Sequence, residues 1–291
     1  MAKTKRRGRA PARGRGVWLN CLRHDLRRLI STPRLYAVLL LSVLFLQSEL
    51  RPLRAFLRES GLRINLLGLA PYLMGDYIFT LLTGAAALLL LCDAPFYDEA
   101  QRYVLLRAGR GAWSFAQASY VLVVCAVYVL AVLALCALLL APYVYISNDW
   151  GEAFEQLVLY GEFENYDIMF ELHPDVYTYM SPVAAAGLSC ALRVLALSAL
   201  GLLLFAVNVS LSPRLGFGIA SIPLALDFSV AEYLSDEVAY FSPVTLSRLP
   251  ALDLSGGGFA PQPCYAAALL VALTALLMAI CVYRARRRIG R

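Results

Sequence analysis

Four ionisable residues lie inside or near the ends of long apolar runs, where an unpaired charge is costly. They are Asp76, Arg193, Asp227 and Glu232. The four residues could line a polar path for a substrate. Alternatively, Arg193 could pair with one of the three acids or extend its side chain toward the membrane interface, and we favour this second interpretation. Acids are not repeated deep in several runs, which argues against a proton-coupled carrier.

Other sequence patterns that would support catalysis are absent. No G-x-x-x-x-G-K-[ST] loop is present, and the glycines at 256–258 have no following lysine, so the chain has no site of this kind for ATP. H-E-x-x-H and G-x-S-x-G are also missing, and the histidines are only His24 and His173. The seven cysteines form no C-x-x-C pair. We therefore expect no catalytic residue, no metal and no cofactor.

Composition places the chain among membrane proteins. Of its 291 residues, 60% are hydrophobic and 16% are charged, against about 45–50% and about 25% in soluble domains. The apolar residues gather in blocks near the ~20 residues that a membrane-spanning helix needs. The predicted fold is an all-α polytopic helical bundle with about six spans, and it leaves no room for a soluble catalytic domain. The expected spans are 35–48, 69–92, 115–146, 182–211, 215–233 and 264–283. Pro223 is expected to interrupt the fifth of them.

The first 33 residues form two segments before the transmembrane domain at 34–283. Residues 1–16 are basic and rich in Gly, Ala and Pro, which indicates a disordered tail rather than a cleaved signal. From Val17 to Ile30, apolar residues share one helical face and arginines occupy the other, which is typical of a helix lying in the membrane interface. Pro33 favours a break before the first span. The segment 17–33 is therefore predicted to be an interfacial helix.

Basic residues predict the orientation. Eleven Lys and Arg precede the first span, and five more follow the last one in the tail 284–291. By the positive-inside rule, both termini face the cytoplasm of a cell membrane, which requires an even number of spans. The loops after spans two and four are then cytoplasmic. The segment 49–68 would be extracytoplasmic, although its four arginines run against that rule.

The cytoplasmic loop between spans two and three reads DAPFYDEAQRYVLLRAGRG from Asp93 to Gly111. Together with the amphipathic segment Val17–Ile30, the six spans and the long return 234–263, this loop resembles the permease subunits of ABC-type exporters of the type-2 permease family. Their cytoplasmic loop has an acidic part, a Leu-Leu pair and a basic part. The resemblance covers nearly the whole chain in layout but only about 20 residues in motif.

The resemblance implies that a separate ABC ATPase docks on this loop and that ATP hydrolysis occurs only in that partner. The chain itself would not be an enzyme and would pair with a second copy or with a sister permease. Anionic lipid would hold the basic N-terminal segment, and no nucleic acid is expected as a partner. The expected docking residues are Phe96, Tyr97, Asp98, Glu99, Arg102, Tyr103, Leu106, Arg107 and Arg110.

A different class of function stays open for the segment 147–180. It holds eight acids, no Lys or Arg, and a set of aromatic residues. Such a surface would suit a cationic amphipathic peptide, as in an immunity or sensor protein that transports nothing. A solvated acidic loop is the simpler interpretation. In the family that the chain resembles, this connection is usually shorter. The aromatic residues are Trp150, Phe154, Tyr160, Phe163, Tyr166, Phe170, Tyr177 and Tyr179.

Overall fold

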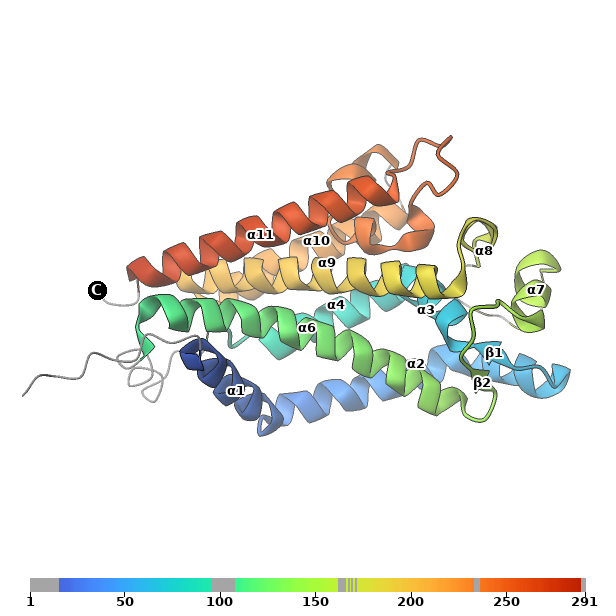
Figure 1. Cartoon of the computed structure of the whole chain (residues 1–291), viewed down its shortest axis with the longest axis horizontal. Coiled ribbons are helices and arrows are strands. Elements are labelled where there is room, and N and C mark those ends of the chain that lie inside the picture. The colour runs from blue at the N-terminus through green and yellow to red at the C-terminus, as the bar shows by residue number, and fades with distance from the viewer. Residues whose placement is uncertain are drawn as a thin grey trace, which may run out of the picture.

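The chain folds as an all-α helical bundle in which the long helices run roughly along one axis (Figure 1). The structure is a computed structural model. It describes residues 16–95, 108–161, 166, 168, 170, 172–232 and 236–288. Both the N-terminal helix and the end of the C-terminal helix lie at one end of the bundle, which we call the basic end. The shorter elements of the connecting segments lie at the opposite end (Figure 1).

The first two helices meet at the predicted proline. Helix α1 spans Gly16–Ile30, and α2 spans Pro33–Ser60 with Pro33 in its first turn. We expected a span at 35–48 followed by a separate amphipathic segment at 49–68, but α2 continues without interruption to Ser60. Its 28 residues correspond to about 42 Å at 1.5 Å per residue, which is longer than the ~30 Å hydrocarbon core. The charged part of α2 can therefore extend beyond a membrane.

The next apolar run is divided between two helices. Helix α3 spans Leu66–Gly75 and α4 spans Tyr77–Leu91, with an angle of 84° between them. The expected continuous span 69–92 is therefore bent sharply at Asp76. Every residue of α3 from Gly68 to Gly75 is buried, so this helix lies inside the protein.

Helix α6 spans Arg110–Leu140, where we expected a span at 115–146. A two-residue strand follows, β2 at Val144–Tyr145. It pairs in parallel with β1 at Ile64–Asn65. The short helices α7 at Glu152–Leu159 and α8 at Pro174–Tyr179 then cover the end of the bundle opposite the basic end (Figure 1).

The C-terminal half contains α9 at Pro182–Ser210, α10 at Pro213–Glu232 and α11 at Pro263–Arg288. We expected Pro223 to interrupt the fifth span, but α10 is continuous through it. Three short 3-10 helices lie between α10 and α11. They are η2 at Asp236–Phe241, η3 at Thr245–Ser247 and η4 at Leu249–Ala251.

Four of the described helices are long and apolar enough to cross a membrane, namely α2, α6, α9 and α11. The bent pair α3 and α4 brings the number to five if it counts as one span. Helix α10, the remaining expected span, is not among them. It is 20 residues long and carries Arg214, Asp227 and Glu232. The structure thus supports a membrane protein.

Helix α9 is the most buried of the four candidate spans. In its most apolar stretch of 18 residues, 67% of the residues are buried, against 22% in the corresponding stretches of α2 and α11. Close approach to its neighbours depends on Gly201. A Cβ atom there would lie 2.6 Å from Leu91 Cδ1 of α4 and 2.6 Å from Val121 Cγ1 of α6. Small residues allow such close helix packing in membrane proteins.

We predict that Gly201→Val lowers the stability of the protein by about 1–3 kcal/mol, because the added atoms overpack the contact of α9 with α4 and α6. Gly187→Val is the matched control, since a Cβ atom at Gly187 on the same helix meets nothing within 4 Å. Thermal unfolding of both variants in the same detergent checks the prediction. Equal melting temperatures for the two variants would contradict it.

Candidate functional site

The break between α3 and α4 leaves backbone groups without helical partners, as every helix end does. Asp76 serves the start of α4: its Oδ1 accepts a hydrogen bond from the Phe79 N–H at 2.6 Å. The Thr80 hydroxyl donates to the Asp76 carbonyl, also at 2.6 Å. The carboxylate lies at the N-terminus of α4, where the helix dipole favours negative charge.

Two arginines donate hydrogen bonds to the carbonyl groups at the end of α3. The Arg193 guanidinium from α9 donates to the Met74 carbonyl, and its Nη2 also donates to Thr80 Oγ1 at 2.7 Å. Arg248, between η3 and η4, donates from Nε to the Gly75 carbonyl at 2.6 Å. Positive charge is favoured at a helix C-terminus. Both sides of the break are thus capped by charges of the favourable sign.

Asp227 brings α10 into the same cluster. Its side chain is buried, and its Oδ1 accepts a hydrogen bond from the Thr245 hydroxyl at 2.6 Å. The same oxygen lies 3.6 Å from Nη1 of Arg248. Since an isolated buried carboxylate would be very costly, Asp227 and Arg248 compensate each other. We call Asp76, Thr80, Arg193, Asp227, Thr245 and Arg248 the break cluster.

Three of the four predicted intramembrane charges, Asp76, Arg193 and Asp227, therefore belong to one cluster. The position of the fourth, Glu232, is at the end of α10, and its side chain lies outside the described residues. Arg193 donates its hydrogen bonds to Met74 and Thr80, and Asp227 pairs with Arg248. The pairing of Arg193 with an acid and the substrate path both remain predictions. Sequence reasoning missed Arg248. A lone arginine beside Pro250 in an otherwise apolar stretch was the available signal.

The predicted docking loop lies mostly outside the described residues, which include Arg110 but not Phe96–Arg107. The first residues of the loop contact α2 and α9. Asp93 Oδ2 lies 2.5 Å from Nη1 of Arg34 at the start of α2. The Asn208 side-chain amide of α9 donates to the Ala94 carbonyl at 2.8 Å. The chain thus enters the loop from a fixed position at the basic end.

Helix α1 is attached to the beginning of α6. Asp25 of α1 is buried, and its Oδ2 accepts a hydrogen bond from Gln117 Nε2 at 2.7 Å. The rings of Trp18 and Phe115 meet edge to face at 5.6 Å. The pKa of the Cys21 thiol on the same helix is raised, mainly because the thiol is buried and to a smaller extent because the negative charge of Asp25 is near. The amphipathic segment is thus a docked helix, and its place in a membrane interface stays a prediction.

The acidic segment 147–180 uses several aromatic residues for packing. Trp150, Phe154 and Phe170 are buried, and the Trp150 indole N–H donates to the Met180 carbonyl at 3.0 Å. Tyr160 and Tyr179 are exposed, while Phe163 lies outside the described residues. Three of the seven described aromatic residues of this segment are therefore packed inside the protein, which leaves less surface for a ligand.

Among the described residues, no group of three His, Cys, Asp or Glu side chains is arranged to hold a metal ion. The break cluster can hold charges and helix ends together. Comparison of the chain with protein-family models, curated proteins and solved structures finds no match. The resemblance to ABC permeases therefore rests on the sequence layout described above.

We predict that Arg193→Met destabilises the protein by about 1–3 kcal/mol, because the buried Met74 carbonyl and Thr80 hydroxyl lose the hydrogen bonds that Arg193 donates. Amide hydrogen exchange should also accelerate in α3 and the first turn of α4. Arg214→Met, at an exposed position of α10, is the control. Melting temperature and peptide-level exchange measure both effects. Similar behaviour of the two variants would show that the cluster does not hold the break.

Proposed function

We propose that this chain is the membrane permease subunit of an ABC-type exporter that works with a separate ATPase. The observation that carries the proposal is the position of the described residues on either side of the predicted docking loop. The Ala94 carbonyl accepts a hydrogen bond from Asn208 near the end of α9, and α6, which begins at Arg110, starts at the basic end with α1 and the end of α11 (Figure 1). A loop in that position would face a cytoplasmic ATPase.

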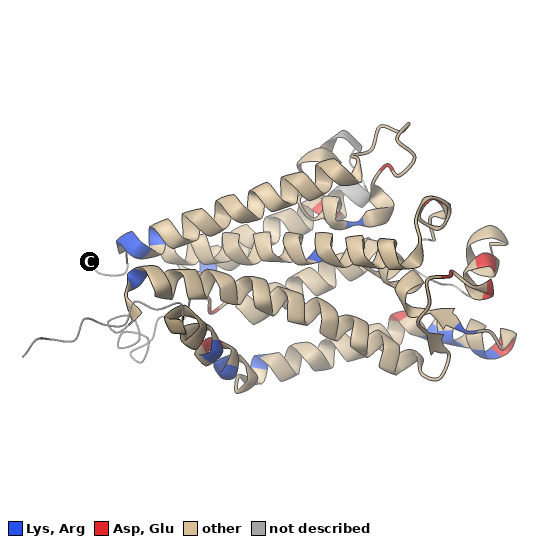
Figure 2. Ribbon diagram, viewed as in Figure 1, with Lys and Arg blue, Asp and Glu red and all other residues tan. Residues whose placement is uncertain are grey.

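The charge distribution supports this orientation. Lys and Arg colour α1 and the neighbouring ends of α6 and α11, whereas acids colour α7 at the opposite end, where the arginines of the last turns of α2 also lie (Figure 2). Basic residues are retained on the cytoplasmic side of membrane proteins. The connection between α10 and α11, which would be extracytoplasmic in this orientation, carries a charged acid. The Ser255 hydroxyl and nearby backbone N–H groups donate hydrogen bonds to the exposed Asp253 carboxylate and lower its pKa, so this residue remains charged.

Helix α4 gives the proposed transporter a mechanical link. It begins at the break cluster and ends beside the docking loop. Its 15 residues span about 22 Å at 1.5 Å per residue. Movement of the loop on an ATPase would therefore displace a rigid helix whose other end lies beside Arg193 and Arg248. A second copy or a sister permease would complete the path, and anionic lipid would bind the basic α1.

The docking proposal predicts that the chain co-purifies with an ABC ATPase subunit encoded in the same genome. Phe96→Asp and Arg107→Glu should each reduce capture of the ATPase about tenfold or more, because truncating or reversing a side chain at the centre of an interface costs 2 kcal/mol or more. Capture is measured by affinity purification of co-expressed chains in mild detergent.

Matched controls come from the opposite end of the bundle. Phe259→Asp and Arg58→Glu make the same changes at exposed positions and should leave capture unchanged. If the chain purifies as a stable protein and captures none of the ABC ATPases tested, the transporter proposal is wrong. Equal losses in all four variants would place the docking surface elsewhere.

The orientation predicts different cysteine accessibility at the two ends. In a variant that retains only Cys264, the thiol is exposed beside the start of α11 and should react with an impermeant maleimide on intact cells. A cysteine-free chain carrying Ser212→Cys, in the turn between α9 and α10, should react only after permeabilisation. Gel-shift labelling measures both. The reverse pattern would invert the topology.

A further inference from the structure

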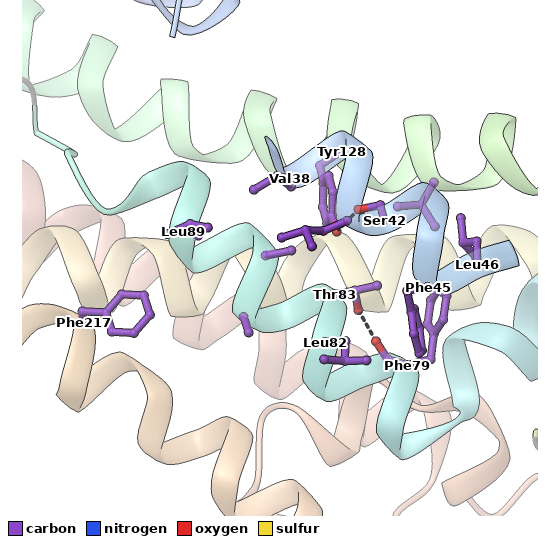
Figure 3. A pocket seen from close by; sticks show the side chains of 14 residues that line it. Val38, Ser42, Phe45, Leu46, Phe79, Leu82, Thr83, Leu89, Tyr128 and Phe217 are labelled. Carbon is purple, nitrogen blue, oxygen red and sulfur yellow. Dashed lines mark hydrogen bonds between the residues drawn. The ribbon is translucent and has the colours of Figure 1, made fainter. Parts of the chain in front are cut away.

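An apolar crevice of about 370 Å³ opens on the side of the bundle between α2, α4, α6 and α10 (Figure 3). Its size lies within the range of small-molecule sites. Side chains at its mouth, including Leu41, Leu82 and Leu89, are exposed and would face lipid in a membrane. No charged residue lines it. The crevice thus suits a hydrocarbon chain that enters from the bilayer.

One wall of the crevice is polar. The hydroxyl oxygens of Ser42 and Tyr128 lie 3.3 Å apart (Figure 3), and both residues line the crevice. Thr83 lies nearby, with its hydroxyl donating to the Phe79 carbonyl at 2.6 Å. A ligand that is apolar throughout would leave this hydroxyl pair without a new partner. The wall therefore favours a ligand that ends in an oxygen acceptor.

Behind this wall lies a second, much smaller cavity of about 10 Å³. It shares Phe79, Thr83, Tyr128 and Val132 with the crevice and is also lined by Arg193. Arg193 is 2% exposed, and its Nε has no hydrogen-bond partner among the described residues. A buried donor without a partner costs free energy. Such a group can be satisfied by a ligand oxygen that reaches it.

We propose that the crevice binds a long-chain fatty acid. Its hydrocarbon chain lies between α2 and α4, and its carboxyl group meets the Ser42–Tyr128 pair and points toward Nε of Arg193. The inner cavity of about 10 Å³ has room for about one oxygen atom, so a compact carboxyl group that directs one oxygen into it fits better than a phosphate-bearing lipid head group. The hydrocarbon chain passes from the bilayer into an equally apolar crevice, so the contacts of the carboxyl group distinguish this ligand from other lipids.

The test is photolabelling of the purified chain in phosphatidylcholine nanodiscs with a diazirine-bearing palmitic acid. Labelled peptides, identified by mass spectrometry, should come from α2 and α4. Ala86→Trp fills the crevice and should reduce labelling about tenfold, because the indole ring takes the space that the hydrocarbon chain would occupy. Ala184→Trp, at an exposed alanine of α9 outside the crevice, should label like the unchanged chain.

Two further arms examine the head group and the fold. Tyr128→Phe should weaken labelling by palmitic acid but not labelling by a diazirine-bearing hydrocarbon that has no carboxyl group. Excess palmitic acid should compete, whereas excess lysophosphatidylcholine should not. Ala85→Trp, at the more exposed neighbour of Ala86, repeats the filling test if Ala86→Trp fails to fold. Equal labelling of the Ala86→Trp or Ala85→Trp variant and the Ala184→Trp control would overturn the proposal.

This inference goes beyond the proposed transport function and does not depend on it, because the labelling uses the permease chain without an ATPase. Loss of ATPase capture with labelling retained would remove the exporter and leave a fatty-acid site in a membrane protein. Capture of the ATPase without labelling of α2 and α4 would leave the exporter and remove this ligand.

Discussion

The rest of the bundle depends on how the backbone is satisfied at the break between α3 and α4. Inside a membrane protein, irregular backbone is tolerated only where protein or water supplies its hydrogen bonds. Here Arg193 and Arg248 bind the carbonyl groups of Met74 and Gly75, and Asp76 binds the N–H of Phe79. Because the two arginines come from α9 and from the η3–η4 segment, both elements must lie beside the break.

This requirement explains why helices distant in sequence are held together at the end opposite the basic end. Arg248 is also held by Asp227, so α10 is tied to the same point. At the basic end, other contacts join distant helices: Arg34 forms an ion pair with Asp93, and the Asn208 amide donates a hydrogen bond to the Ala94 carbonyl. Helix α4 runs between these two sets of contacts. A change at either end therefore has a short, rigid route to the other, through side chains that are already hydrogen bonded.

The sequence predicted elements wherever the apolar pattern alone decides them. Helix α9 begins at the expected residue and ends one residue earlier than expected, at Ser210, and Arg193 was recognised as a charge needing partners. The bend at Asp76 was missed because residues 69–92 read as one apolar run. The break is stabilised by hydrogen bonds from Arg193 and Arg248, which are distant in sequence. At Pro223 the prediction was wrong in the opposite sense, because we expected a break and α10 is continuous there. A proline removes one backbone hydrogen bond, yet a membrane helix can continue through it when its neighbours compensate.

The crevice and the break cluster meet on one turn of α4. The ring of Phe79 lines the crevice and lies 5.9 Å from that of Phe45, while its backbone N–H is bound by Asp76. The next residue, Thr80, receives a hydrogen bond from Arg193. A hydrocarbon chain in the crevice would press on the turn that the buried charges hold. A ligand in the crevice would therefore contact the broken helix directly, at Phe79.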